Sequence, residues 1–155
     1  MLFIIFKAGK ASYALEAHRV IEVIPIVTLR ACPGAPDYIA GLANYRGIGV
    51  PIVDLGRLVD RTPCAVYLST RIILTPYAGK GNQQRVIGIL AETVTNTMER
   101  EEADFSQNTV AAPGASGLDK LAVNGAGFIQ RVVVEQLVPK ELEQMLFAES
   151  EKPAS

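Results

Sequence analysis

The sequence predicts a mostly-β fold of the barrel type. The 155-residue chain contains many short runs of β-branched and aromatic residues. Turns rich in glycine separate these runs at close spacing, which is typical of β-sandwiches and barrels. Hydrophobic residues make up 49% of the chain and charged residues 20%, so the composition favours a buried core over intrinsic disorder. The pattern leaves open whether the strands form two small barrels or a single large one.

The first half of the chain is predicted to contain four strands and two short helical segments. Apolar runs at residues 2–6 and 12–15 flank a tight turn at residues 8–10. A β-branched run over residues 20–25 ends at Pro25, which lacks an amide hydrogen and suits a strand end or edge. The remaining predictions are a helix over residues 37–42, a strand over 50–54 and a helical turn over 55–59.

The second half is predicted to consist of two hairpins and a final helix. The strands are expected over residues 71–75, 85 to about 98, 121–123 and 127–134, with turns at residues 78–82 and 124–125. Leu142, Met145 and Leu146 lie at helical spacing and predict an amphipathic helix over residues 139–147. We expect one domain over residues 1–148, followed by a polar tail over residues 149–155.

Charge and hydropathy exclude several classes of partner. The formal net charge is −1, which gives no electrostatic attraction toward nucleic acid. No apolar run approaches the length of about 20 residues that a membrane span needs, and the N-terminal run has no basic region or cleavage site. These observations predict a cytoplasmic protein with no direct membrane insertion. The two cysteines, Cys32 and Cys64, are expected to be small buried or half-buried residues.

Catalytic and metal-binding patterns are weak in this sequence. His18 is the only histidine and has no neighbouring ligand residue, so we expect a surface side chain and no metal or cofactor site. The glycines around residues 41–49 match neither a dinucleotide-binding fingerprint nor a phosphate loop. An enzyme or small-ligand barrel, with a site built from Glu22, Asp54 and Arg46, is the competing hypothesis.

The segment from residue 36 to residue 55 is the most informative part of the chain. It places a single charged group, Arg46, in an Asn-x-Arg-Gly turn among glycines and aliphatic residues. Glu22 likewise lies within the apolar run Val20-Ile21-Glu22-Val23-Ile24. A carboxylate in an apolar setting needs a partner, so we expect a Glu22–Arg46 ion pair, with a solvent-facing glutamate as the alternative. This arrangement suits docking better than catalysis.

These residues together resemble the CheW-type chemotaxis coupling proteins. The resemblance rests on residues 13–16 and 19–23, on Ala35-Pro36-Asp37-Tyr38-Ile39-Ala40-Gly41-Leu42 followed by Asn44-Tyr45-Arg46-Gly47, on residues 50–55, and on residues 85–89 with Glu92 and Val94. It covers nearly the whole chain.

The resemblance implies two five-stranded, SH3-like β-barrel subdomains with a groove between them. It also implies a non-enzymatic adaptor that couples the cytoplasmic tips of chemoreceptors to the regulatory domain of a CheA-type histidine kinase at receptor arrays on the inner membrane. By position, the receptor-binding groove would include Val20, Gly41, Arg46, Gly47 and Val94, and Glu22 would pair with Arg46.

Some residues depart from the family pattern. Tyr45 and Thr97 stand where aliphatic residues are common, and Glu92 replaces a common aspartate. Residues 15–18 and 68–71 also resemble the coupling proteins of surface-sensing, Wsp-type pathways. The alternative function is therefore the same adaptor role in a non-motility pathway such as cyclic-di-GMP signalling.

Overall fold

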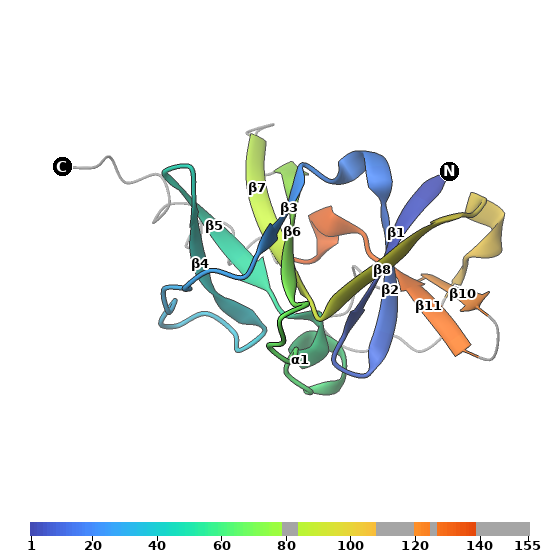
Figure 1. Cartoon of the computed structure of the whole chain (residues 1–155). Coiled ribbons are helices and arrows are strands. Elements are labelled where there is room, and N and C mark those ends of the chain that lie inside the picture. The colour runs from blue at the N-terminus through green and yellow to red at the C-terminus, as the bar shows by residue number, and fades with distance from the viewer. Residues whose placement is uncertain (79–83, 108–119, 125–126, 139–155) are drawn as a thin grey trace.

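The computed structural model describes residues 1–78, 84–107, 120–124 and 127–138 (Figure 1). The strands are β1 Leu2–Ala8, β2 Ala11–Glu16, β3 Glu22–Pro25, β4 Ile39–Tyr45, β5 Ile48–Val53, β6 Arg71–Ala78, β7 Gln84–Ala91, β8 Thr93–Glu99, β9 Ser106–Gln107, β10 Lys120–Asn124 and β11 Gly127–Arg131. The helical elements are α1 Leu55–Asp60 and the 3₁₀ turns η1 Ala17–Arg19, η3 Glu102–Asp104 and η5 Val134–Gln136. No helix among these residues is long and apolar enough to cross a membrane.

The strands form two sheets that lie side by side (Figure 1). One has six strands in the order β8-β1-β2-β11-β10-β9, of which β9 contributes two residues, and the other has five in the order β3-β6-β7-β5-β4. Pairing is antiparallel except for β2 with β11 and β5 with β7. The mostly-β prediction is therefore confirmed, and the prediction of two equal sets of five strands gives way to sheets of six and five.

A bend at Glu92 connects the two sheets. The sequence predicts one strand from residue 85 to about residue 98, but the structure divides it into β7 and β8, which belong to different sheets. The backbone amide of Glu92 donates to the Lys7 carbonyl at 2.7 Å, and its side-chain Oε1 accepts from the amides of Gly9 at 3.1 Å and Ala65 at 2.9 Å. Glu92 is 7% exposed, so a buried carboxylate holds three chain segments at the junction.

The predicted helix over residues 37–42 is wrong. Residues 39–45 form β4, which pairs with β5 over its whole length through a bulge between Ile39 and Gly41. Long-range pairing with an apolar strand overrides the local helix-start signal at Pro36 and Asp37. The predicted helical turn at residues 55–59 is confirmed as α1, which is the only α-helix in the part of the chain that the structure describes. The predicted C-terminal helix over residues 139–147 and the tail over 149–155 lie outside the described residues.

Asp54 determines where α1 begins. Its Oδ1 accepts from the amides of Gly56 at 3.0 Å and Arg57 at 3.3 Å, which otherwise lack partners at a helix N-terminus. The same carboxylate accepts from the Cys64 amide at 3.1 Å, so it also fixes the loop that follows the helix. Asp54 is 3% exposed. It therefore acts as a structural cap, which argues against a catalytic role.

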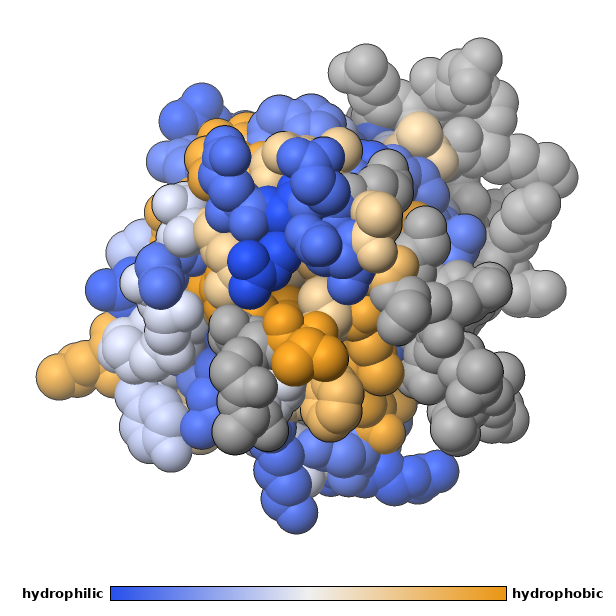
Figure 2. Space-filling view, turned by 90° about the vertical axis from the view of Figure 1, so that its right-hand side faces the viewer, coloured by the Kyte–Doolittle hydropathy of each residue, from blue (hydrophilic) through white to orange (hydrophobic). Residues whose placement is uncertain are grey.

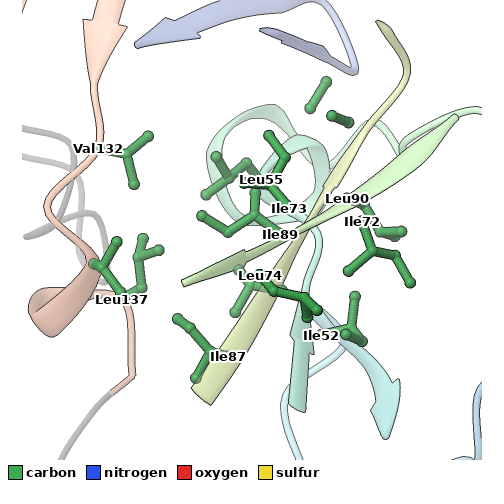
Figure 3. Close-up of a cluster of buried hydrophobic side chains, with 14 of the residues drawn as sticks. Ile52, Leu55, Ile72, Ile73, Leu74, Ile87, Ile89, Leu90, Val132 and Leu137 are labelled. Carbon is green, nitrogen blue, oxygen red and sulfur yellow. The ribbon is translucent and has the colours of Figure 1, made fainter. Parts of the chain in front are cut away.

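The main hydrophobic core lies against the five-stranded sheet (Figure 3). Fully buried side chains from three adjacent strands, β6, β7 and β5, contribute Ile52, Ile72, Ile73, Leu74 and Ile89. Figure 3 shows Val132 and Leu137, from the segment after β11, lying opposite these strands. A smaller cluster, centred on Phe3, Ile5 and Phe105, belongs to the six-stranded sheet. Because the segment after β11 leaves one sheet and packs on the core of the other, burial stabilises both sheets as one unit.

Candidate protein-docking site

The turn between β4 and β5 presents Arg46 to solvent. Its loop has two residues, Arg46 and Gly47, with φ angles of 52° and 84°. Positive φ at both loop residues marks a type I′ hairpin turn, whose twist matches that of the flanking strands. The Gly47 amide donates to Asn44 Oδ1 at 2.9 Å and closes the turn. The Asn-x-Arg-Gly pattern thus specifies a tight hairpin that holds an exposed cation at its tip.

Glu22, Tyr45 and Arg46 form a cluster at this tip. The Tyr45 hydroxyl donates to Glu22 Oε2 at 2.6 Å, and Arg46 Nη2 lies 3.6 Å from the same oxygen. The Arg46 guanidinium also lies 5.1 Å from the centre of the Tyr45 ring, within cation–π range. The hydrogen bond to Glu22, and more weakly partial burial, raise the pKa of Tyr45, while the neighbouring Arg46 opposes the shift. The phenol therefore bridges the carboxylate and the guanidinium.

The tyrosine is the member of this cluster that the sequence does not identify. The spacing and setting of Glu22 and Arg46 predict a direct pair, but the closest partner of Glu22 is Tyr45. The available signal was that Tyr45 stands next to Arg46 in a strand where the family usually has an aliphatic residue. A polar ring at such a position needs a hydrogen-bond partner.

The other predicted groove residues lie in different settings. Gly41 is buried, with φ at 147°, and an added Cβ would lie 2.6 Å from the Arg30 carbonyl oxygen. Its role in this structure is to allow the segment around Arg30 to pair with β4. Val20 and Val94 are half-buried against the main core, before β3 and within β8 respectively. Arg46 and Gly47 share the hairpin tip, whereas Val94 belongs to the other sheet. That these residues line a common groove therefore stays a prediction.

Two exposed aliphatic residues are neighbours of members of the charged cluster. Ile48 is the cross-strand partner of Tyr45, so both side chains lie on one face of the hairpin. Ile48 is 51% exposed and Ile21, next to Glu22, is 47% exposed. An accessible cation bordered by aliphatic groups suits recognition of another protein.

Two further exposed apolar groups lie elsewhere on the molecule. Val66, Tyr67 and Leu68 are consecutive exposed residues in the loop before β6. On the side that carries β10 and β11, Figure 2 shows apolar side chains between hydrophilic ones. The exposed apolar residues of those two strands are Val123 and Phe128, which are cross-strand partners.

The residues that could support catalysis do not converge. His18 is a surface residue, as predicted, and lies 3.3 Å from Glu16. Burial raises the pKa of the Cys64 thiol to about 12, with Asp54 and Glu92 adding to the shift, so the thiol stays protonated near neutral pH. Within the described ranges there is no group of three or more potential metal ligands.

A small cavity lies between η1 and η5. Its volume is about 60 Å³, below the several hundred Å³ of a typical ligand site. The charged residues that line it are already paired, Arg131 with Glu16 and Arg19 with Glu135. This arrangement cross-links the elements around the cavity and offers little to a substrate.

Comparison with known protein families decides the identity of the fold. The model of the CheW-like domain family matches residues 2–141. The chain belongs to this family. CheW-family membership makes it a non-enzymatic scaffold of chemotaxis signalling that couples chemoreceptors to a CheA kinase.

Individual relatives agree with this assignment. The chain is 27% identical over 145 residues to the chemotaxis protein CheW of Klebsiella aerogenes, covering 90% of this chain and 82% of that protein. It is 26% identical over 128 residues to the protein FrzA of Myxococcus xanthus, covering 83% and 73%. The crystal structure of the scaffolding protein TtCheW from Thermoanaerobacter tengcongensis superposes with a TM-score of 0.76 at 20% identity, covering 90% and 89% of the two chains. That likeness supports the CheW fold.

Proposed function

We propose that this CheW-family scaffold binds a chemoreceptor's cytoplasmic tip through the surface around Arg46 and binds the kinase's regulatory domain through a second surface. The observation that carries the proposal is the exposure of Arg46, whose side chain is 75% accessible although two neighbours orient it. An oriented but accessible guanidinium on a rigid turn costs little entropy to use in binding. Such a charge favours correct orientation of a partner.

The partner's mode of binding follows from the surface. A helix of the receptor tip would lay its aliphatic side chains against Ile48, Ile21 and the half-buried Val20 and Val94. Arg46 would fix the register of the helix. The scaffold then transmits a signal because it holds receptor and kinase in one assembly, where a shift in the receptor changes the kinase's equilibrium.

The five-stranded sheet supports the proposal of an SH3-like barrel subdomain. Strands β3 and β4 are its two edges, and the contact between Glu22 and Tyr45 brings these edges together. A sheet whose edges meet is curled toward closure. We propose a cytoplasmic location at receptor arrays, because the partners' signalling domains are there. The Wsp-type pathway stays a prediction that identification of the partner genes would test.

The experiment compares Arg46→Ala with Arg61→Ala. Both arginines are exposed and both have positive φ, at 52° and 58°, so alanine imposes the same charge loss and a similar backbone strain at each position. We expect Arg46→Ala to weaken capture of the receptor tip while Arg61→Ala leaves it unchanged, with similar melting temperatures for the two variants. Equal capture by both variants would remove Arg46 from the binding surface.

A further inference from the structure

We infer that Tyr45, Arg46 and Ile48 form a single docking platform that selects a partner helix with a carboxylate beside aliphatic side chains. This inference rests on the proposed function and specifies the chemistry of the receptor-side partner. Tyr45 and Ile48 are absent from the set of groove residues that family resemblance supplies. Their contacts in this chain carry the argument.

The first step concerns the charge that Arg46 offers. Among the described residues its ion-pair contact is Glu22 at 3.6 Å, longer than a hydrogen bond. The nearer oxygen of Glu22 already accepts the Tyr45 hydroxyl at 2.6 Å. Glu22 therefore attracts the guanidinium without occupying its donors. Five N–H donors on a planar group, three-quarters exposed, match a carboxylate that arrives from outside.

The second step concerns direction. The Tyr45 ring lies 5.1 Å from the Arg46 guanidinium carbon, and the hydroxyl of the same ring is anchored to Glu22 across the sheet edge. An anchored ring restricts the rotamers of the cation that packs on it. Positive φ at Arg46 fixes the direction of its Cα–Cβ bond as well. Tyr45 is thus a positioning residue, because it acts through Arg46.

The third step concerns the apolar part of the platform. Ile48 is opposite Tyr45 in the β4–β5 pair and is 51% exposed, so its side chain lies on the same face as the ring. The face therefore offers an aliphatic contact next to a directed cation. A partner helix complements it with an aliphatic residue and an acidic residue one turn apart, since positions three or four apart share a helix face.

The test uses purified cytoplasmic tip fragments of the chemoreceptors of the same organism as probes. Binding affinity is measured by titration calorimetry for the wild type, Tyr45→Leu, Arg46→Lys and the control Tyr67→Leu, which replaces an exposed tyrosine in the loop before β6. We expect both platform variants to weaken binding about tenfold and the control to leave it unchanged. Arg46→Lys retains the charge and the fold, so it tests planar recognition even where Tyr45→Leu is unstable.

Two further measurements distinguish a role in binding from a purely structural role of Tyr45. They are the salt dependence of the affinity and an exchange of charges between Arg46 and the partner. Wild-type affinity should fall between about 0.05 and 0.3 M salt, and the fall should be smaller for Arg46→Ala. Arg46→Glu should lose binding and regain it with a tip whose contacting acidic residue is changed to lysine. Wild-type affinity in Arg46→Lys, or a salt-independent affinity, overturns the inference. Failure of the wild type to bind any receptor tip would instead contradict the proposed function.

Discussion

The Tyr45 hydroxyl donates to Glu22 Oε2 at 2.6 Å and thereby joins the two edge strands of the five-stranded sheet. These strands, β4 and β3, are separated by three others in the sheet order. An edge strand usually presents unpaired backbone groups and needs protection. In this chain a side-chain contact links the two edges, and the tyrosine that makes this contact also packs against the Arg46 guanidinium. The proposed barrel closure and the proposed docking surface therefore share one residue pair.

Tyr45→Phe removes the hydroxyl and keeps the ring. We expect a lower melting temperature at neutral pH, because Glu22 loses its closest partner. The pKa of Tyr45 is raised by this hydrogen bond, so its contribution to stability is present below the ordinary tyrosine pKa of about 10 and is lost as the pH rises through the raised value. Thermal melts of both proteins from about pH 7 to pH 11 should therefore converge at the alkaline end. A constant difference across the range would contradict this role.

Glu22→Gln tests whether the negative charge of Glu22 contributes to the raised pKa of Tyr45. The amide keeps an acceptor oxygen for Tyr45 but removes the negative charge. We expect the Tyr45 pKa to fall toward its ordinary value, measured as tyrosinate absorbance relative to Tyr45→Phe. An unchanged titration would show that the negative charge of Glu22 does not contribute to the shift.

Gly56→Ala should be strongly destabilising although the glycine lies in a helix. A Cβ at this position would lie 2.1 Å from the Thr62 carbonyl oxygen and 3.2 Å from Gly9, so the backbone would have to move. We expect a loss of about 3 kcal/mol in the free energy of unfolding, measured by urea denaturation. Gly34→Ala is the control, because its Cβ would meet nothing within 4 Å and only its positive φ of 86° opposes alanine. That change should cost about 1 kcal/mol. Equal losses would show that steric contact at Gly56 is unimportant.

Glu92→Ala should disrupt the junction between the two sheets. It leaves the amides of Gly9 and Ala65 without their acceptor in a buried position, at a cost of about 3 kcal/mol. Glu92→Gln retains an acceptor oxygen and should cost less. Glu99→Gln, on the exposed end of β8, serves as the surface control and should change stability by less than about 0.5 kcal/mol. A loss in Glu92→Ala no greater than that of the control would contradict the junction role.

The sequence predicts most strands correctly because their signal is local. β-branched runs and glycine turns identify β1, β2, β3, β5 and β6 without information from distant residues. The predicted helix at residues 37–42 is wrong because pairing with β5 determines the secondary structure of this segment. Local helix propensity carries no information about that pairing. The bend at Glu92 is missed for a similar reason. One continuous run rich in β-branched residues serves two sheets, and only the three-dimensional contacts of Glu92 divide it.

The sequence identifies the charged residues of the candidate site but not how they contact one another. Apolar surroundings of Glu22 and Arg46 indicate that each needs a polar partner, and the structure places them 3.6 Å apart. Their shared partner Tyr45 could not be assigned, because whether its hydroxyl turns toward β3 depends on how the sheet curls. For Gly41 the sequence resemblance suggests binding, but the structure shows a packing role. The glycine is buried and permits close approach of the backbone around Arg30.

The Cys64 thiol should be inert in the folded protein. Burial raises its pKa to about 12 and the nearby Asp54 and Glu92 carboxylates add to the shift, so the reactive thiolate is scarce. Because the folded-state pKa is raised, this group's contribution to stability is complete below the unfolded value of about 8.5 and is lost as the pH rises toward 12. In a Cys32→Ser variant, a thiol reagent at about pH 8 should label Cys64 only after denaturant is added. The reciprocal Cys64→Ser variant isolates the half-buried Cys32. Labelling of native Cys64 at the rate of the denatured chain would contradict its buried, protonated state.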